Sequence, residues 1–197
     1  MDAVIIDSGG ANLASLQFAF ERLGAQTLVT SDTRTIASAR RVVLPGVGAA
    51  ADAMQRLCNS GAAELLPRLT QPVLGICLGM QLLFERSEEG STQCLGILPG
   101  SVRRLHPAPG LPVPHMGWNQ LAVLRNDPIL DGIGASDYVY FVHSYAAPLS
   151  DVTLASAEYG IPLSAIVRKG NFWGAQFHPE RSAHTGARLL ANFLRLD

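Results

Sequence analysis

The pentapeptide Gly75-Ile76-Cys77-Leu78-Gly79 has the spacing of a nucleophile at a sharp turn between a strand and a helix. Such a turn leaves little room, so small residues are needed two positions before and two after the nucleophile. Cys77 would then begin a helix, whose dipole favours the reactive thiolate. The amide of Leu78 would be free to bind an oxyanion. The alternative interpretation is a buried core cysteine flanked by packing glycines.

A nucleophilic cysteine requires a general base and a group that orients this base. Among the five histidines, His178 is singled out by the segment Gln176-Phe177-His178-Pro179-Glu180, which follows a strand-like run. The carboxylate of Glu180, two residues on, could fix the tautomer of the imidazole. The alternative is a His-Pro loop at a strand end without chemistry. No two histidines have the spacing of metal ligands, so a metal site is the weaker interpretation.

The loop Pro45-Gly46-Val47-Gly48 is the third candidate segment. Functional loops of an open α/β sheet gather at the carboxyl ends of its strands, which places this loop beside Cys77. Gly46 and Gly48 allow a backbone amide to face the oxyanion, or allow the peptide at Val47 to flip. A phosphate-binding loop is excluded, because neither glycine-rich phosphate motif is present.

The elements that would position these segments alternate between strand and helix in the first half of the chain, which predicts an α/β fold. We expect an open, three-layer arrangement with a mostly parallel central sheet flanked by helices. The predicted strands are Ala3–Ile6, Thr27–Thr30, Arg41–Leu44 and Pro72–Ile76, and the predicted helices are Leu13–Leu23, Ala49–Cys58 and Leu78–Phe84.

The second half contains short strand-like runs separated by Pro, Gly, Asn and Asp, which predicts antiparallel strands appended to the sheet. Without a linker or a repeat, residues 1–197 are predicted to form a single domain. The predicted strands are Val102–Leu105, Leu121–Leu124, Tyr138–Val142, Val152–Ala157, Ala165–Arg168 and Phe172–Phe177, followed by a helix over Thr185–Leu196.

Composition excludes several classes of protein. Hydrophobic residues make up 48% and charged residues 16%, so the chain is not a disordered one. Fifteen Lys and Arg against sixteen Asp and Glu leave a net charge of −1, which favours neither nucleic acid nor an anionic membrane as a partner. Three cysteines without Cys-x-x-Cys spacing fit a reducing compartment. With no signal peptide or apolar span, we expect a cytoplasmic protein. We also expect no cofactor and no metal.

Together the motifs resemble the class I (triad) glutamine amidotransferases, nearly from end to end. The cysteine and histidine motifs are shared by that whole class. Met80 before Gln81, the Pro-Gly-Val-Gly loop and the segment His115–Asn119 are similar, more narrowly, to the glutaminase subunits of imidazole glycerol phosphate synthases. The matching segments are Pro45–Gly48, Gly75–Phe84, His115–Asn119, Phe141–Tyr145 and Gly174–Glu180.

The resemblance implies that Cys77, His178 and Glu180 form a catalytic triad that hydrolyses glutamine to glutamate and ammonia. It also implies an oxyanion site at Leu78 and the loop of Gly46, Val47 and Gly48. The substrate amino acid would be held by Gln81, Glu89, Ser144 and Tyr145.

The resemblance further implies a partner, the (β/α)₈-barrel cyclase subunit HisF, which would receive the ammonia within a heterodimer. Residues matching the family's interface are Asn12, Met116, Trp118, Tyr140 and Arg181. The chain departs from the family in its first turn, Ser8–Asn12, which lacks the usual tyrosine. It also has Ala50 in place of a common phenylalanine and Arg181 in place of a lysine, which changes the geometry of any ion pair there.

Two other functions remain open from the sequence, besides a cysteine peptidase or chaperone of similar α/β fold, against which Gln81 and the His178-Pro179-Glu180 turn argue. The chain could supply ammonia to a different synthase, although such relatives generally carry another loop in place of Pro-Gly-Val-Gly. It could instead be a catalytically silent regulatory protein, although an intact set of Cys77, His178 and Glu180 argues against that. Because the peptide at Val47 could rest flipped away from the oxyanion, we expect the isolated chain to hydrolyse glutamine poorly.

Overall fold

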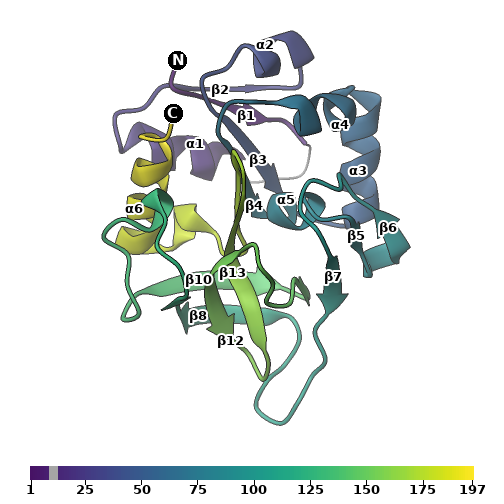
Figure 1. The fold of residues 1–197 in the computed structure, drawn as a ribbon, viewed down its shortest axis with the longest axis vertical. Coiled ribbons are helices and arrows are strands. Elements are labelled where there is room, and N and C mark those ends of the chain that lie inside the picture. Colours follow the sequence, from purple (N-terminus) through teal and green to yellow (C-terminus); the bar gives the residue numbers. More distant parts are fainter. Residues whose placement is uncertain (9–12) are drawn as a thin grey trace.

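The computed structural model describes residues 1–8 and 13–197, and these residues form a central eight-stranded sheet with helices on both faces (Figure 1). The strand order is β2-β1-β3-β4-β14-β13-β12-β9. From β2 to β14 the neighbouring strands are parallel, and from β14 to β9 they are antiparallel. The strands are β1 (Ala3–Ile6), β2 (Thr27–Thr30), β3 (Val42–Gly46), β4 (Val73–Cys77), β9 (Ala122–Val123), β12 (Thr153–Glu158), β13 (Pro162–Lys169) and β14 (Phe172–Ala175).

Side chains of β1 divide the core into two halves, one on each face of the sheet. Ala3 and Ile5 pack in the cluster that contains the apolar residues of α1 and α6. Val4 and Ile6 pack in the cluster that contains those of α3, α4 and α5. Alternation along a strand therefore produces the predicted three-layer α/β arrangement. The helices are α1 (Leu13–Glu21), α2 (Thr33–Ala37), α3 (Ala50–Asn59), α4 (Ala62–Leu65), α5 (Leu78–Leu82) and α6 (Ala183–Phe193).

Two smaller sheets lie beside the central one. β10 (Tyr138–His143) pairs antiparallel with β8 (His115–Gln120). The other sheet has the order β11-β7-β5-β6 and consists of β5 (Arg86–Ser87), β6 (Thr92–Gln93), β7 (Ser101–Arg104) and β11 (Tyr145–Ala146).

The sequence does not predict β8, α2, α4 or the two-residue strands β5, β6 and β11, and α5 ends two residues earlier than predicted. In β8 the large apolar residues Met116 and Trp118 are exposed while the polar His115 is buried. This reverses the usual pattern of a half-buried strand, so alternation could not identify it. α2 and α4 span five and four residues, too few for helical periodicity to show.

The start of α5 lies directly against the strands because glycines stand at each point of contact. A Cβ atom added at Gly79 would be 1.8 Å from the carbonyl oxygen of Leu44, in β3. A Cβ atom added at Gly75 would be 2.8 Å from the backbone of Met80. Only glycine leaves room for this approach. The close contact between α5 and the strands holds Cys77 at the carboxyl edge of the sheet.

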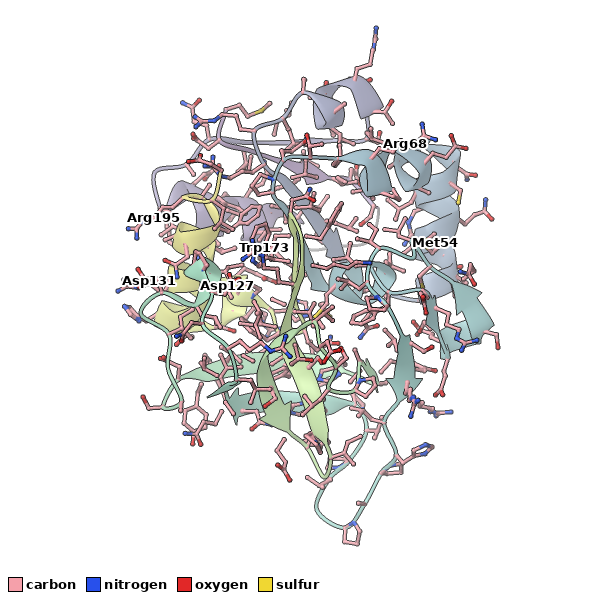
Figure 2. All side chains as sticks on the ribbon, in the orientation of Figure 1. Met54, Arg68, Asp127, Asp131, Trp173 and Arg195 are labelled. Atoms are coloured by element: carbon pink, nitrogen blue, oxygen red, sulfur yellow. The ribbon has the colours of Figure 1, made fainter. Side chains whose placement is uncertain are left out.

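β14, which leads to His178, is anchored at one side by Asp127. Asp127 and Trp173 are labelled in Figure 2. The Asp127 carboxylate accepts a hydrogen bond of 3.0 Å from the indole Nε1 of Trp173 and forms an ion pair of 2.7 Å with Arg168. The guanidinium of Arg168 also lies 4.6 Å from the centre of the Trp173 ring. A buried indole N–H requires such a partner.

Within residues 1–8 and 13–197, no helix is both long and apolar enough to cross a membrane.

Candidate active site

Cys77 occupies the turn between β4 and α5 in a conformation that is uncommon for a side chain other than glycine. Its φ is 53° and its ψ is −113°, and such backbone strain is typical of functional sites. Cys77 is 7% exposed. Its Sγ lies 3.8 Å from the carbonyl oxygen of Val142 and 3.9 Å from Nε2 of Gln176.

His178 reaches Cys77 from the neighbouring strand of the sheet. β14 runs parallel to β4, with Ala175 opposite Ile76, so both chains leave the sheet at the same edge. Nδ1 of His178 lies 2.8 Å from Oε1 of Glu180, and both side chains are nearly buried. Burial alone would lower the pKa of His178. Hydrogen bonds to Cys77 and Glu180, with their charges, outweigh burial and raise this pKa to about 10.

The turn that carries His178 and Glu180 is supported from two sides. The hydroxyl of Ser182 donates to the carbonyl oxygen of His178 at 2.7 Å and accepts from the amide of Tyr140, in β10, at 2.9 Å. A Cβ atom at Gly186, in α6, would be 2.0 Å from the carbonyl oxygen of Pro179. The close approach of α6 and the buried Ser182 therefore hold the imidazole and the carboxylate in place.

The loop of Gly46, Val47 and Gly48 borders the thiol, as predicted from the sheet edge. Gly46 is the register partner of Cys77 in the β3–β4 pair, and a Cβ atom on it would be 2.8 Å from the amide nitrogen of Gly79. Gly48 has a φ of +90°, which disfavours any other residue. Backbone amides can therefore approach the space in front of Cys77 closely.

These residues line one pocket of about 470 Å³. Its walls contain all of the predicted catalytic, oxyanion-site and substrate-binding residues, together with one predicted interface residue, Arg181. They are Cys77, His178, Glu180, Gly46, Val47, Gly48, Leu78, Gln81, Glu89, Ser144, Tyr145 and Arg181.

Gln81 and Glu89 line the pocket and also form hydrogen bonds within the protein. Nε2 of Gln81 donates to the carbonyl oxygen of Tyr145 at 2.7 Å and to Oε1 of Gln176 at 2.9 Å. Oε2 of Glu89 accepts from the amide of Ala50 at 2.8 Å, which is the first residue of α3. Glu89 therefore caps a helix as well as facing the pocket.

Comparison with known proteins identifies the family. The profile of the family "Glutamine amidotransferase class-I" matches residues 4–196. The imidazole glycerol phosphate synthase subunit HisH of Xylella fastidiosa strain Temecula1 is 55% identical over 196 residues, covering 100% of this chain and 98% of the relative. The HisH subunit of Xanthomonas campestris pv. campestris strain 8004 is 54% identical over the same shares. The chain belongs to the class-I glutamine amidotransferases, in the HisH family.

Solved structures agree with the fold of this amidotransferase. A glutamine amidotransferase crystal structure has a TM-score of 0.77 at 20% identity, over 98% of this chain and 97% of that one. A structure of PurLQS from Thermotoga maritima has a TM-score of 0.72 at 20% identity, over 98% and 96% of the two chains. At such identities the likeness concerns the fold.

The predicted interface residues of the amidotransferase lie mainly on the β8–β10 pair, outside the pocket. Met116 and Trp118 are 61% and 53% exposed. The Trp118 ring contacts that of Tyr140 edge to face, with centroids 6.0 Å apart, and the guanidinium of Arg181 lies 4.4 Å from the Tyr140 centroid. Asn12 lies outside the described residues.

Three polar residues of the amidotransferase are buried near the site although sequence reasoning gave them no role. Gln176 is fully buried and contacts both Gln81 and Cys77. His115 and His143 are buried against each other, with Nδ1 of the first 3.0 Å from Nε2 of the second. No local pattern identifies Gln176, because it follows the end of β14 and its partner Gln81 lies 95 residues away in the chain. The pairing of His115 with His143 could not be predicted, because His115 lies in β8 and the sequence did not predict this strand.

Among the residues that the structure describes, no group of three or more His, Cys, Asp or Glu side chains is placed to hold a metal ion.

Proposed function

We propose that the chain is the glutaminase subunit of an imidazole glycerol phosphate synthase, with Cys77 as nucleophile, His178 as proton donor and acceptor, and Glu180 as the group that orients His178. One observation carries this assignment. The thiol, imidazole and carboxylate all line one pocket, and Nδ1 of the imidazole lies 2.8 Å from Oε1 of the carboxylate.

The proposed reaction begins when the thiolate of Cys77 attacks the side-chain amide carbon of glutamine. Negative charge on the carbonyl oxygen is stabilised by the amide of Leu78 and a backbone amide of the loop at Val47. The imidazolium of His178 protonates the amide nitrogen, so the C–N bond breaks and ammonia leaves a thioester on Cys77. Neutral His178 then removes a proton from water, which hydrolyses the thioester to glutamate and restores the thiolate.

The substrate amino acid is proposed to lie against Gln81, Glu89, Ser144 and Tyr145. Both amide hydrogens of Gln81 are directed to Tyr145 and Gln176, so Oε1 is the atom that Gln81 can offer to a ligand. An amide oxygen and the Glu89 carboxylate suit the α-ammonium group of glutamine.

The partner is proposed to be the cyclase subunit HisF, as a heterodimer joined at Met116, Trp118, Tyr140, Arg181 and Asn12. Ammonia released into water would be protonated and lose its nucleophilicity, so direct transfer to a synthase is required. The cyclase would combine it with a phosphoribulosyl aminoimidazole carboxamide nucleotide to form imidazole glycerol phosphate and an aminoimidazole carboxamide ribotide.

The free thiols of Cys58, Cys77 and Cys94 fit a location in the cytoplasm.

The first test measures glutamate release from glutamine by this chain alone, with the cyclase, and with the cyclase plus its nucleotide. We expect turnover to be weak alone and to rise with each addition, because the oxyanion peptide at Val47 is proposed to need the partner. A Cys77→Ala variant should abolish turnover in every condition. Strong turnover that is indifferent to the cyclase would indicate another synthase, and no turnover in any condition would leave a silent regulatory protein.

A further inference from the structure

The buried pair His115 and His143 has no part in the proposed reaction, yet its hydrogen bonds are defined at both ends. Each imidazole nitrogen of the pair has one polar neighbour. A neutral imidazole donates from one nitrogen and accepts at the other, so the neighbours determine the tautomer.

The outer end of the pair is set by Asn119. Its Nδ2 donates to the carbonyl oxygen of Glu158 at 2.8 Å, and its Oδ1 accepts from the amide of Gln120, so the orientation of this amide is fixed. The same Nδ2 lies 3.3 Å from Nε2 of His115, which must therefore accept. The proton of His115 is then on Nδ1, where it is donated to Nε2 of His143.

The inner end of the pair leads to the same result independently. Nδ1 of His143 lies 2.8 Å from the carbonyl oxygen of Tyr145, which can only accept. His143 must therefore carry its proton on Nδ1 and accept at Nε2. This agrees with the assignment from Asn119, so both rings are neutral and protonated on Nδ1.

The same carbonyl oxygen also accepts from Gln81, and a second series of hydrogen bonds leads from Gln81 to the thiol. Because Tyr145 can only accept there, the atom of Gln81 at 2.7 Å is Nε2, and its second hydrogen goes to Oε1 of Gln176. Gln176 must then turn its own Nε2 toward Cys77, 3.9 Å from Sγ. An N–H group directed at sulfur favours the thiolate.

We infer that the carbonyl oxygen of Tyr145, which accepts from both His143 and Gln81, fixes the direction of the hydrogen bond from Gln81 to Gln176 and so makes Gln176 donate to the Cys77 thiolate. This inference rests on the proposed function of Cys77. His115, His143 and Gln176 are positioning residues: the two histidines hold the Tyr145 carbonyl in place, and Gln176 presents its N–H group to the thiolate.

Packing supports the neutral state of the pair. The His115 ring is stacked between Phe141 and Tyr159, with centroids 4.8 and 4.0 Å away. Burial lowers the pKa of His115 to about 4, and it lowers the pKa of His143 to about 3 despite the hydrogen bond of His143 to Tyr145. An uncharged pair in this position can hold the Tyr145 carbonyl without placing a charge in the core.

The first experiment requires no substitution. ¹⁵N NMR of histidine-labelled complete chain at pH 7 should show that His115 and His143 are neutral and protonated on Nδ1, with His115→Phe used to assign the resonances. If either ring were protonated on Nε2, or were cationic at pH 7, the proposed arrangement of hydrogen bonds would be wrong.

The second experiment measures the thiolate directly. In a Cys58→Ser background, which removes the exposed thiol, the rate of Cys77 alkylation by iodoacetamide at pH 7 should fall about fivefold in Gln176→Met, because the donor to sulfur is lost. The matched control is Gln93→Met, at an exposed position in β6. An unchanged rate in Gln176→Met would overturn the role of Gln176.

The third experiment separates positioning from packing. His115→Phe keeps a ring between Phe141 and Tyr159 but cannot donate to His143, so kcat/KM for glutamine should fall about tenfold even where the folded fraction is unchanged. Loss of thermal stability with unchanged kcat/KM would indicate a purely structural role. If the native chain with its cyclase releases no glutamate, the proposed function fails, whereas the NMR and alkylation results still decide on the chain of hydrogen bonds.

Discussion

The protonation of His178 is set by what surrounds it rather than by its own chemistry. Its side chain is almost fully buried, yet its pKa is raised to about 10, because Cys77 and Glu180 outweigh the effect of burial. An imidazolium at neutral pH is the form that can protonate departing ammonia. The imidazolium also lines the same pocket as the sulfur of Cys77, which is proposed to attack glutamine.

Glu180→Gln should therefore lower the pKa of His178, because the imidazolium loses one of the two anionic partners that hold its proton. The high-pH limb of kcat/KM reflects loss of that proton, so it should move to lower pH in the variant. We expect kcat to fall at least about a hundredfold, since an amide can also select the wrong tautomer. The measurement is a pH profile of glutamate release with the cyclase present. An unshifted high-pH limb would show that Glu180 does not hold the proton of His178.

At the scale of elements, the site depends on how closely α5 approaches the sheet. Gly46, Gly75 and Gly79 bring the backbone of the helix start within contact distance of β3 and β4. The strained φ of Cys77 follows from this approach, because the chain must reverse direction within one residue. Side chains at these glycines would push the nucleophile away from the sheet edge.

Gly79→Ala should destabilise the fold by about 3 kcal/mol or more, because its Cβ would overlap the Leu44 carbonyl, a group of the backbone that cannot rotate away. Gly24→Ala is the matched comparison. Gly24 has a φ of +77°, but nothing lies within 4 Å of a Cβ atom added there. Only the left-handed backbone conformation then opposes alanine, so we expect a loss of about 1 kcal/mol in the free energy of unfolding. Urea unfolding of both variants measures the difference. Equal losses would contradict the overlap at Gly79.

At the scale of the whole molecule, one face presents large apolar side chains to solvent. Met116, Trp118 and Tyr138 come from β8 and β10 and are each more than half exposed. Tyr140 and Arg181 join this face to the pocket, since Arg181 lines the pocket and covers the Tyr140 ring. Exposed aromatic residues clustered beside an active site fit a docking surface.

Trp118→Ala should weaken binding of the cyclase by about 2 kcal/mol or more, as expected for a tryptophan anchor at the centre of an interface. Isothermal titration calorimetry with the purified cyclase provides the measurement. Leu28→Ala is the control, since Leu28 is 42% exposed on β2, at the opposite edge of the central sheet. Equal affinity for Trp118→Ala and the native chain would remove Trp118 from the proposed interface.

The α/β class and the segments that carry the chemistry can be predicted from the order of the amino acids. The elbow around Cys77, the loop at Gly46 and the turn with His178 and Glu180 are local patterns, because each depends on residues within a few positions of one another. The apolar run of β4 and the periodicity of α1 are local in the same way. All of these predictions agree with the positions of the elements and with the walls of the pocket.

Which polar groups meet across long distances in the chain depends on how the strands are paired in three dimensions. Gln81 and Gln176 are 95 residues apart, and His115 and His143 are 28 apart. Their partners are set by the pairing of β8 with β10 and by the order of strands around β4 and β14. Composition and periodicity say which side of a strand a residue faces, but not which strand lies opposite. The direction of the hydrogen bonds that reach Cys77 therefore follows from the fold alone.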